Sequence, residues 1–360
     1  MNIYWEIIIA TAVLAFLFRR YRKAFVVSTA ILHGFIAAFR YNHMHGDLMK
    51  YHSEYEDLAN YSLFSNRILR SGKNTLFYML NKIVGDYTNH NFQALIIIIA
   101  VISAIALGVL IYRYSEKPFI SFLLWNCFGF YIFTFYSIKQ ALAMAIIMLA
   151  AACVVEEKRR LFYILVAIAG FVHFPAFIFL PAYELSRLKR ARSIITVYLT
   201  IFIIIFIFRN SIVQAMTDVY YEEETVFEET TVVIGGKTMM LIAIFIMGLL
   251  MCSMNDKVSR VSVLLVGVAM IIQMFSIYDN VFTRLADYYF QFVILLIPSM
   301  LRQRCHGLPY PRMFFNEKSQ RILTYMIVAL AIVYYQRTTL GAYSGGVDDL
   351  VHNFAFMWQK

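Results

Sequence analysis

The chain has 360 residues, of which 61% are hydrophobic and only 15% are charged, and its mean hydropathy is +0.66. Soluble domains are about half apolar and about a quarter charged, so this composition excludes a soluble globular protein. Lys and Arg (32) exceed Asp and Glu (22), which gives a net charge of +10. The basic residues gather in short loops between apolar runs, which indicates cytoplasmic loops of a membrane protein and no nucleic-acid partner.

Long apolar runs predict the membrane-crossing elements in chain order. Unbroken runs such as residues 95–111 indicate helices, because the strands of a membrane barrel would alternate apolar and polar residues. The expected spans lie near residues 3–18, 24–39, 92–112, 118–133, 138–155, 193–208, 238–254, 261–277, 285–301 and 322–336. We therefore predict an all-α, polytopic integral membrane protein with about 10–12 membrane helices, in which residues 1–360 form a single membrane domain.

One apolar segment, residues 161–185, does not fit a simple alternation of spans. Basic clusters at residues 19–23, 113–117, 158–160, 187–192, 257–260 and 302–312 predict cytoplasmic loops. The segment would then begin and end on the cytoplasmic side. Pro175 lacks an amide donor and disfavours helix at Phe174, so we expect a broken or re-entrant pair of half-helices that turns near His173. The alternative is one span, with the cluster at 187–192 as an exception to the charge rule.

This topology gathers the polar segments on the outer face of the membrane. They are the loop 40–90, the step at 137–140, the acidic loop 210–237, the corner 278–289 and the tail 338–360. Residues 47–70 and 74–84 mix apolar and charged side chains, as amphipathic helices at a membrane interface do. The loops 40–90, 210–237 and 278–289 are expected to face the substrate. For the acidic loop, a plain solvated loop is the expectation and a mobile gate is the alternative.

The first cluster of candidate functional residues follows the second expected span and consists of Arg40, Tyr41, His45, Asp47 and Tyr51. Ionisable groups within or beside spans are costly and therefore indicate function by default. Arg40 ends its span, where a guanidinium either binds phosphate oxygens through a two-point fork or extends to the interface as an anchor. Gly46 would permit a tight turn that exposes Asp47. The neighbouring histidines have no matching set of carboxylates, so we expect no metal site.

Two further candidate regions lie along the middle of the chain. Tyr136, Lys139 and Gln140 stand at the start of the span 138–155, either as an interface anchor or as part of a site. His173 lies within the broken apolar segment, and discontinuous helices often build binding sites in membranes. Its imidazole is able to accept or donate a proton near neutral pH. The alternative is a hydrogen-bonded core histidine.

The last cluster holds Arg284, Asp287 and Tyr288. Arg284 and Asp287 are one helical turn apart, a spacing at which the two side chains can pair. The alternative is that Arg284 serves as a second outer-face cation, which an anionic ligand would require.

Taken in order, these residues resemble the EpsG family of Wzy-like bacterial exopolysaccharide and capsule polymerases. The resemblance covers most of the chain and rests on Arg40 with Gly46, Asp47 and Tyr51, then the Leu76-Phe77-Tyr78-Met79-Leu80 segment, Lys139-Gln140 opening an Ala-rich span, His173 ending an Ala-rich run, and Arg284 with Tyr288 four residues on. The sequence departs from the family pattern at four places. It has His45 where the family usually begins a Gly-Thr-Asp triplet, Asn74 near an acidic position, Lys139 where Arg is common, and Pro175 where a small hydroxyl residue is usual.

The resemblance implies a reaction at the outer face of the bacterial plasma membrane. Such polymerases transfer the growing glycan from undecaprenyl pyrophosphate to the next lipid-linked repeat unit, without a cofactor and alongside other capsule or exopolysaccharide assembly proteins. Arg40, Lys139 and Arg284 would stabilise the lipid diphosphate leaving group, and Asp47 or His173 would deprotonate the acceptor hydroxyl. The expected catalytic set is Asp47, His173, Arg40 and Arg284. The expected substrate-binding set is Tyr41, His45, Tyr51, Tyr136, Lys139, Gln140 and Tyr288.

Two other classes of protein fit parts of this pattern. A flippase or transporter of lipid-linked oligosaccharides would also need broken helices and a cationic outer cavity, but such proteins commonly carry internal repeats, and the sequence shows none. Another membrane glycosyl- or acyltransferase would also use a histidine such as His173. The reaction product distinguishes the three, because only a polymerase makes a ladder of repeat units.

Overall fold

A computed structural model describes residues 3–41, 47–69, 73–208, 210–212, 214, 235–279, 281–301, 317–342 and 354–359 of the chain. The elements in these ranges are all helices, apart from one isolated antiparallel bridge between Arg40 and Phe356. The chain divides into two compact units. Unit 1 is residues 1–177 with 313–360, and unit 2 is residues 178–312. The single membrane domain expected over residues 1–360 stays a prediction.

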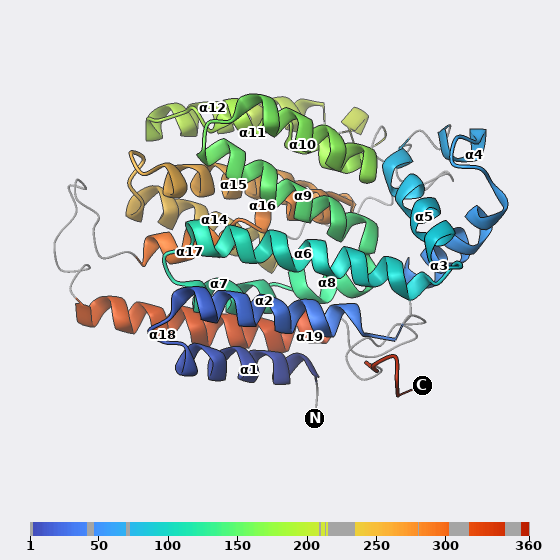
Figure 1. Ribbon diagram of the computed structural model, residues 1–360. Helices are drawn as coiled ribbons and strands as arrows, with labels where there is room; N and C mark the ends of the chain where they lie inside the picture. Colours follow the sequence, from blue (N-terminus) through green and yellow to red (C-terminus); the bar gives the residue numbers. More distant parts are fainter. Residues whose placement is uncertain are drawn as a thin grey trace. The chain divides into compact units, whose positions relative to one another are not determined.

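Unit 1 is a bundle of apolar helices with shorter amphipathic helices at one end (Figure 1). The bundle consists of α1 (Ile3–Leu17), α2 (Arg22–Ala38), α6 (Phe92–Tyr114), α7 (Pro118–Cys127), α8 (Phe130–Tyr136), α9 (Ile138–Val155), α10 (Arg159–Val172), α18 (Glu317–Tyr334), the π-helix Tyr335–Thr339 and α19 (Leu340–Ala342). The short helices are α3 (Asp47–Asp57), the 3₁₀ turn Leu58–Asn60, α4 (Asn66–Leu69) and α5 (Thr75–Tyr87). The amphipathic helices predicted in the loop 40–90 are confirmed.

Small residues allow α2 and α6 to pack closely. A Cβ added to Gly34 would lie 2.9 Å from Ala104 Cβ, and one added to Gly108 would lie 3.1 Å from Ala30 Cβ. Close approach at small residues is the usual way in which membrane helices associate, because lipid offers no hydrophobic driving force between them. Arg22 connects α2 to α6 at the end of the pair where α2 begins. Its Nη2 donates to the carbonyls of Tyr112 (2.8 Å) and Ser115 (2.6 Å), which satisfies the end of α6.

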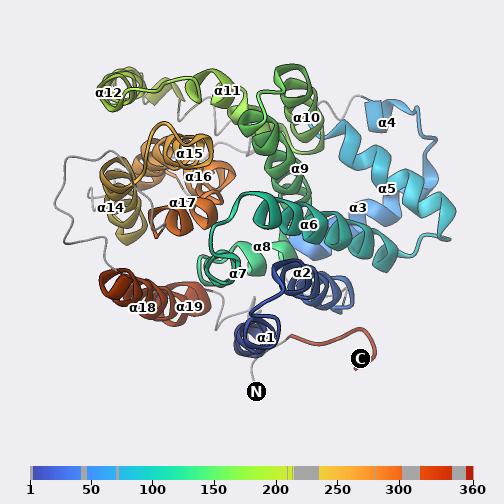
Figure 2. The ribbon, with the colours of Figure 1, turned by 60° about the vertical axis from the view of Figure 1, so that its left-hand side comes forward.

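Unit 2 is built around α15 (Lys257–Met274), which packs against α12 (Ala191–Ile207), α14 (Gly236–Met251), α16 (Val281–Phe290) and α17 (Val293–Met300) (Figure 2). The unit also holds α11 (Ala182–Leu185) and the 3₁₀ turn Phe275–Ile277. Asp256 caps α15, because its carboxylate accepts from the Ser259 amide at 2.9 Å.

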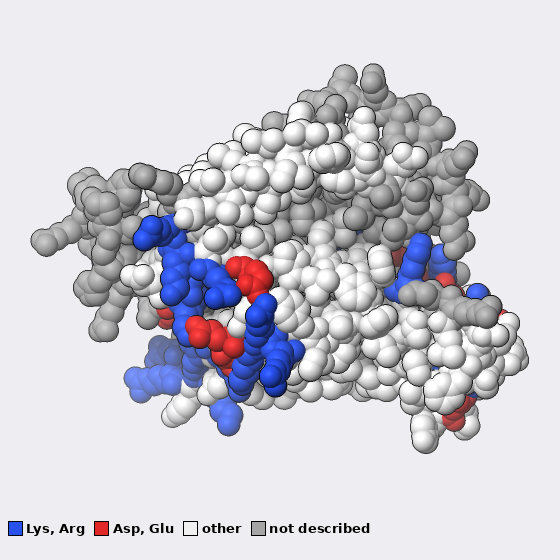
Figure 3. Space-filling model, turned by 90° about the horizontal axis from the view of Figure 1, so that it is seen from above, with Lys and Arg blue, Asp and Glu red and all other residues white. Residues whose placement is uncertain are grey.

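Within the part of the chain that the structure describes, three helices are long and apolar enough to cross a membrane: Phe92–Tyr114, Ile138–Val155 and Lys257–Ile277. The number rises to five if each of two bent pairs counts as one span. Shorter apolar helices occupy Ile3–Leu17, Phe174–Leu185, Ser193–Ile207 and Gly236–Met251. On the face seen in Figure 3, a wide area carries no charged side chain and the Lys and Arg side chains gather toward its edges. The protein is therefore an all-α polytopic membrane protein, as predicted.

Two predicted spans are bent where the sequence analysis expected them to be continuous. The segment 118–133 divides into α7 and α8 with a bend of 52°, because Gly129 adopts a φ of 83° that ends α7. The segment 285–301 divides into α16 and α17 with a bend of 48°. Here the Gln291 side chain donates to the Tyr288 carbonyl at 3.0 Å and competes with the helical hydrogen-bond ladder.

The helix break expected at His173 is confirmed. Helix α10 ends at Val172, His173 is extended (φ −147°, ψ 107°), and a 3₁₀ turn covers Phe174–Phe179. The chain folds back locally, because a Cβ on Gly170 would lie 2.5 Å from Phe177 Cζ. The return of the second half-helix to the cytoplasmic side stays a prediction, since residues 178 onward belong to unit 2.

Replacing Gly267 with alanine is expected to destabilise unit 2 by about 1–3 kcal/mol. The added Cβ would lie 2.3 Å from Tyr198 Cε2 and 2.5 Å from Phe245 Cε2, and these two rings stack with their centroids 5.6 Å apart. Thermal unfolding in detergent measures the effect. Gly236→Ala is the matched control, because a Cβ there would meet nothing within 4 Å. Equal melting of both variants would contradict the packing argument.

Candidate functional site

The amphipathic helices α3 and α5 cover one end of unit 1 (Figure 1). Helix α3 buries Leu48, Tyr51 and Tyr55, and α5 buries Phe77 and Val84. Their buried aromatic faces contact each other, with the Tyr51 and Phe77 ring centroids 5.8 Å apart. Helix α3 also packs against α8, which leads into α9. The two helices therefore cover the start of α9 and face it with aromatic side chains. We call the region formed by α3, α5 and the start of α9 the Lys139 end of unit 1.

Lys139 is surrounded by aromatic rings of this cover. Its Nζ lies 5.2 Å from the ring centroid of Tyr51, 5.6 Å from that of Phe77 and 5.8 Å from that of Tyr78. Cation–π attraction of this kind strengthens when the cation is removed from water. The carboxylates of Glu54 and Asp47 are close enough to act electrostatically on the same ammonium group. The structure therefore brings together Asp47, Tyr51 and Lys139, three residues of the predicted site.

His173 lies at the same end of unit 1. Helices α9 and α10 pack against each other and are joined by a short turn. At 1.5 Å per residue, Lys139 lies about 24 Å and His173 about 21 Å from that turn along the two helices. The amide of Phe174 donates to Asn74 Oδ1 at 3.3 Å, and Asn74 is the N-cap of α5. The predicted histidine is thus tied to the helix that supplies two of the rings around Lys139.

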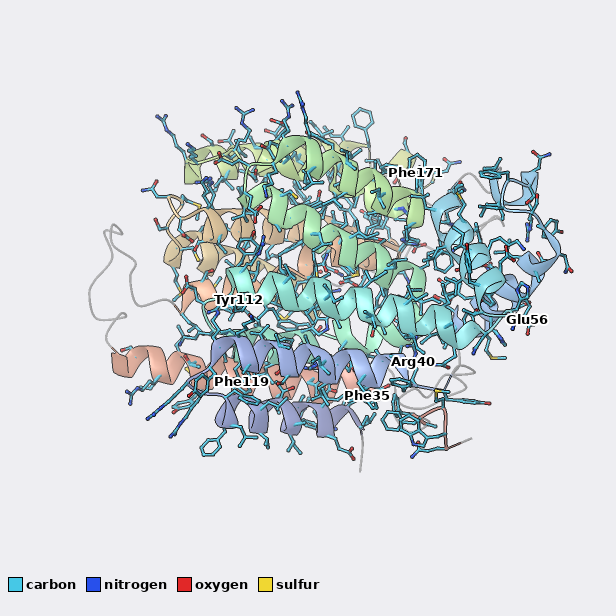
Figure 4. All side chains as sticks on the ribbon, viewed as in Figure 1. Phe35, Arg40, Glu56, Tyr112, Phe119 and Phe171 are labelled. Carbon is cyan, nitrogen blue, oxygen red and sulfur yellow. The ribbon has the colours of Figure 1, made fainter. Side chains whose placement is uncertain are left out.

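Arg40 is buried beneath this end rather than exposed on the outer loop. Only 1% of its surface is accessible. Its Nε donates to the Phe135 carbonyl at 3.1 Å, its Nη1 donates to the Ala37 carbonyl, and its guanidinium lies 5.5 Å from the Phe135 ring centroid. Its Nη2 is buried and has no hydrogen-bond partner among the described residues. Figure 4 shows Arg40 at the end of α2 and Phe171 near the corresponding end of α10.

A small cavity of about 20 Å³ lies beside Arg40 and is also lined by His33, Tyr131 and Thr134. His33 is fully hydrogen-bonded there. Its Nδ1 lies 2.8 Å from the Thr29 carbonyl and its Nε2 lies 3.0 Å from Asn126 Nδ2. This network was not predicted, although His33, an ionisable residue inside the apolar run 24–39, was the available signal.

The other predicted residues of unit 1 lie close to this end or outside the described ranges. The Tyr41 amide donates to the Ala355 carbonyl at 2.8 Å, the Tyr136 ring packs edge-on against Phe133 with centroids 5.1 Å apart, and Gln140 is buried one residue after Lys139. His45 lies outside the described residues.

Unit 2 holds Arg284, Asp287 and Tyr288 on α16. Arg284 is exposed and Tyr288 is fully buried. The ion pair of Asp287 is made with Lys237, whose Nζ lies 2.8 Å from Asp287 Oδ1. Lys237 also lies 5.1 Å from the Phe290 ring centroid. No local sequence pattern indicates Lys237 as the partner of Asp287, because the two residues are 50 positions apart.

Replacing Lys237 with methionine should destabilise the protein by about 1–3 kcal/mol, between the values for exposed and buried ion pairs. The reason is that Asp287, whose side chain is only 16% exposed, would lose its counter-charge. A double-mutant cycle with Asp287→Leu, followed by thermal unfolding, measures the coupling. We expect the double variant to recover most of the loss. A simple sum of the two single losses would show that the pair is not coupled.

The described residues hold no group of three or more His, Cys, Asp or Glu side chains able to bind a metal ion. What the structure does define is a polytopic helical membrane protein whose larger unit carries a cluster of charged and aromatic side chains around Lys139. The family model of the EpsG family matches residues 23–347, and the chain belongs to that family. It is therefore a membrane protein of polysaccharide biosynthesis. No curated protein and no solved structure matches the chain.

Proposed function

We propose that this protein is a Wzy-type polymerase. It transfers a growing glycan from undecaprenyl pyrophosphate to the next lipid-linked repeat unit, at the outer face of the bacterial plasma membrane. The observation that supports this most is the Lys139 end of unit 1, where an ammonium group, carboxylates, aromatic rings and a histidine at a helix break gather beneath amphipathic helices. Membership of the EpsG family supports the same class of substrate.

The proposed reaction is a displacement at the anomeric carbon of the growing chain. The oxygen of an acceptor hydroxyl forms a bond to this carbon, while the bond from the carbon to the pyrophosphate oxygen breaks. The diphosphate leaves with the bonding electrons, and the hydroxyl proton passes to a base, for which we propose Asp47 or His173. Negative charge grows on the diphosphate in the transition state, so we assign Lys139 of unit 1 to its stabilisation. The same role for Arg284 of unit 2 stays a prediction.

The aromatic residues provide surfaces for the sugars. We propose that Tyr41 and Tyr136 present rings or hydroxyls to the repeat unit. Tyr51 and Gln140 are buried, so we assign them to holding the surroundings of Lys139 in place. The role of His45, which lies outside the described residues, stays a prediction. Aromatic rings bind the apolar faces of sugars through their large flat surfaces and retain a polar edge. Tyr288 is fully buried, which favours a role in holding α16 in place beside Arg284.

For Arg40 the structure favours a positioning role over direct contact with the leaving group. Its guanidinium holds the Phe135 carbonyl in the last turn of α8, four residues before Lys139. A cation at the carboxyl end of a helix is stabilised by the helix dipole. We propose that Arg40 fixes the α8–α9 junction and thereby the direction in which Lys139 projects.

The test is a gel of lipid-linked glycans from cells that lack the protein, with and without the wild-type gene restored. We expect a ladder of repeat units with the gene and a single unit without it. An unchanged ladder in the deleted strain would contradict polymerase activity. Addition of only one unit would identify a transferase or ligase, and repeat units retained on the inner leaflet would identify a flippase.

A further inference from the structure

Unit 1 carries a second cavity at the end opposite to Arg40, marked in Figure 4 by Phe119. The cavity measures about 470 Å³ and lies among the end of α1 and the beginnings of α2 and α7, with Thr324 of α18 at its edge. Four cationic side chains line it: Arg19, Arg20, Arg22 and Lys117. We call this cavity the basic pocket.

The charge of the basic pocket is unbalanced. No carboxylate belongs to the described residues that line it. Arg22 is fixed by its bonds to the carbonyls at the end of α6, and Lys117 Nζ lies 3.3 Å from Thr324 Oγ1. Burial lowers the pKa of the Lys117 ammonium, because desolvation penalises its charged form. No hydrogen bond or ion pair to Arg20 occurs among the described residues.

The position of these charges on the helices is also unfavourable without a counter-ion. Arg22 and Lys23 stand in the first turn of α2, which contains no acidic residue. The amino end of a helix carries partial positive charge, so cations placed there are repelled. An anion in the basic pocket would relieve this repulsion and the repulsion among the four lining cations.

The wall of the basic pocket is apolar. Phe18, Phe25 and Phe119 line it together with the charged groups. On the adjacent turn of α1, Phe16 and Leu17 are 70% and 62% exposed, as side chains facing lipid are. A ligand that fits both features has an anionic head and a hydrocarbon chain. A free phosphate ion would use only the cations.

We propose that the basic pocket binds the phosphate headgroup of an anionic membrane lipid, in the leaflet on the side of the basic loops. Arg19, Arg20 and Lys117 contact the phosphate oxygens, Arg22 holds the pocket open by anchoring α2 to α6, and the lipid chain runs along the exposed end of α1. The site is separate from the proposed polymerase site and does not depend on that function.

The experiment is native mass spectrometry of the full-length protein in detergent, with dioleoyl phosphatidic acid, dioleoyl phosphatidylcholine or inorganic phosphate added. The test variant is Arg20→Gln/Lys117→Gln. The control, Arg160→Gln/Lys189→Gln, removes the same charge from exposed basic residues outside the pocket. We expect the wild type to retain phosphatidic acid in preference to phosphatidylcholine. The test variant should bind phosphatidic acid at least about tenfold more weakly, and the control should bind it like the wild type.

Three results would overturn the proposal. Equal loss of phosphatidic acid in the test and control variants would mean that general surface charge attracts the lipid. If phosphatidylcholine were retained as strongly as phosphatidic acid, the basic pocket would not recognise the anionic headgroup. Displacement of the lipid by an equal concentration of inorganic phosphate would show that the chain contributes nothing. The single variant Arg20→Gln should also bind phosphatidic acid more weakly than the wild type. Its melting temperature shows whether the weaker binding results from misfolding.

Discussion

Replacing Lys139 with methionine is expected to reduce the initial rate of glycan polymerisation by about 100- to 1000-fold, the range found when one preorganised charge-stabilising group is removed from an active site. Methionine keeps most of the side-chain volume among Tyr51, Phe77 and Tyr78 but removes the ammonium charge. Membranes supplied with a labelled lipid-linked repeat unit give the rate, and the unextended substrate should accumulate.

The variant Lys139→Arg tests whether the polymerisation rate depends on the positive charge or on the shape of the lysine side chain. A guanidinium retains the charge and stacks well on aromatic rings, so we expect this variant to keep most of the rate. Tyr78→Phe is a second control, because it keeps the ring beside Lys139 and removes only the hydroxyl that lies 3.5 Å from Glu54 Oε2. If Lys139→Met polymerises at the wild-type rate with the same melting temperature, then Lys139 only anchors α3 and α5 to α9.

The parts of the fold that local sequence determines were predicted well. The span 138–155 coincides with α9, because an Ala-rich apolar run has no competing local structure. The break at His173 followed from the restriction that Pro175 places on its neighbour. The bend at Gly129 was missed because glycine is tolerated in apolar helices, and the sequence does not reveal the positive φ that it adopts.

The sequence predicted separate clusters of candidate residues, but it did not predict how these clusters lie relative to one another in the folded chain. The rings around Lys139 come from α3 and α5, far away in sequence, and no periodicity indicates which face of an amphipathic helix meets which span. Arg40 shows the opposite case. Its position at the end of a span suggested exposure to phosphate, yet two backbone carbonyls bind it in the interior. The burial of Arg40 depends on how α8 ends, and the apolar run 118–133 predicts one span where the structure has α7 and α8.

Replacing His173 with alanine should reduce the glycan ladder to one repeat unit at equal expression, and should slow polymerisation by about 100- to 10,000-fold if the imidazole transfers the proton. The effect on folding should be small, because the backbone amide of His173 donates to the Ala169 carbonyl at 2.8 Å and ends α10, and alanine retains this hydrogen bond. His52→Ala is the matched control. His52 lies on α3 in the same end of unit 1, where it packs against Phe92 with centroids 4.7 Å apart, and it has no part in the proposed chemistry.

Asp47→Asn decides between the two proposed bases. If Asp47 accepts the proton, Asp47→Asn should lose as much activity as His173→Ala, because an amide keeps the hydrogen-bonding shape but cannot take up a proton. If His173 is the base, Asp47→Asn should retain partial activity. Full activity in both variants would remove acid–base catalysis from this site. Lys139 and the aromatic rings would then be left to orient two lipid-linked substrates whose reaction proceeds by proximity alone.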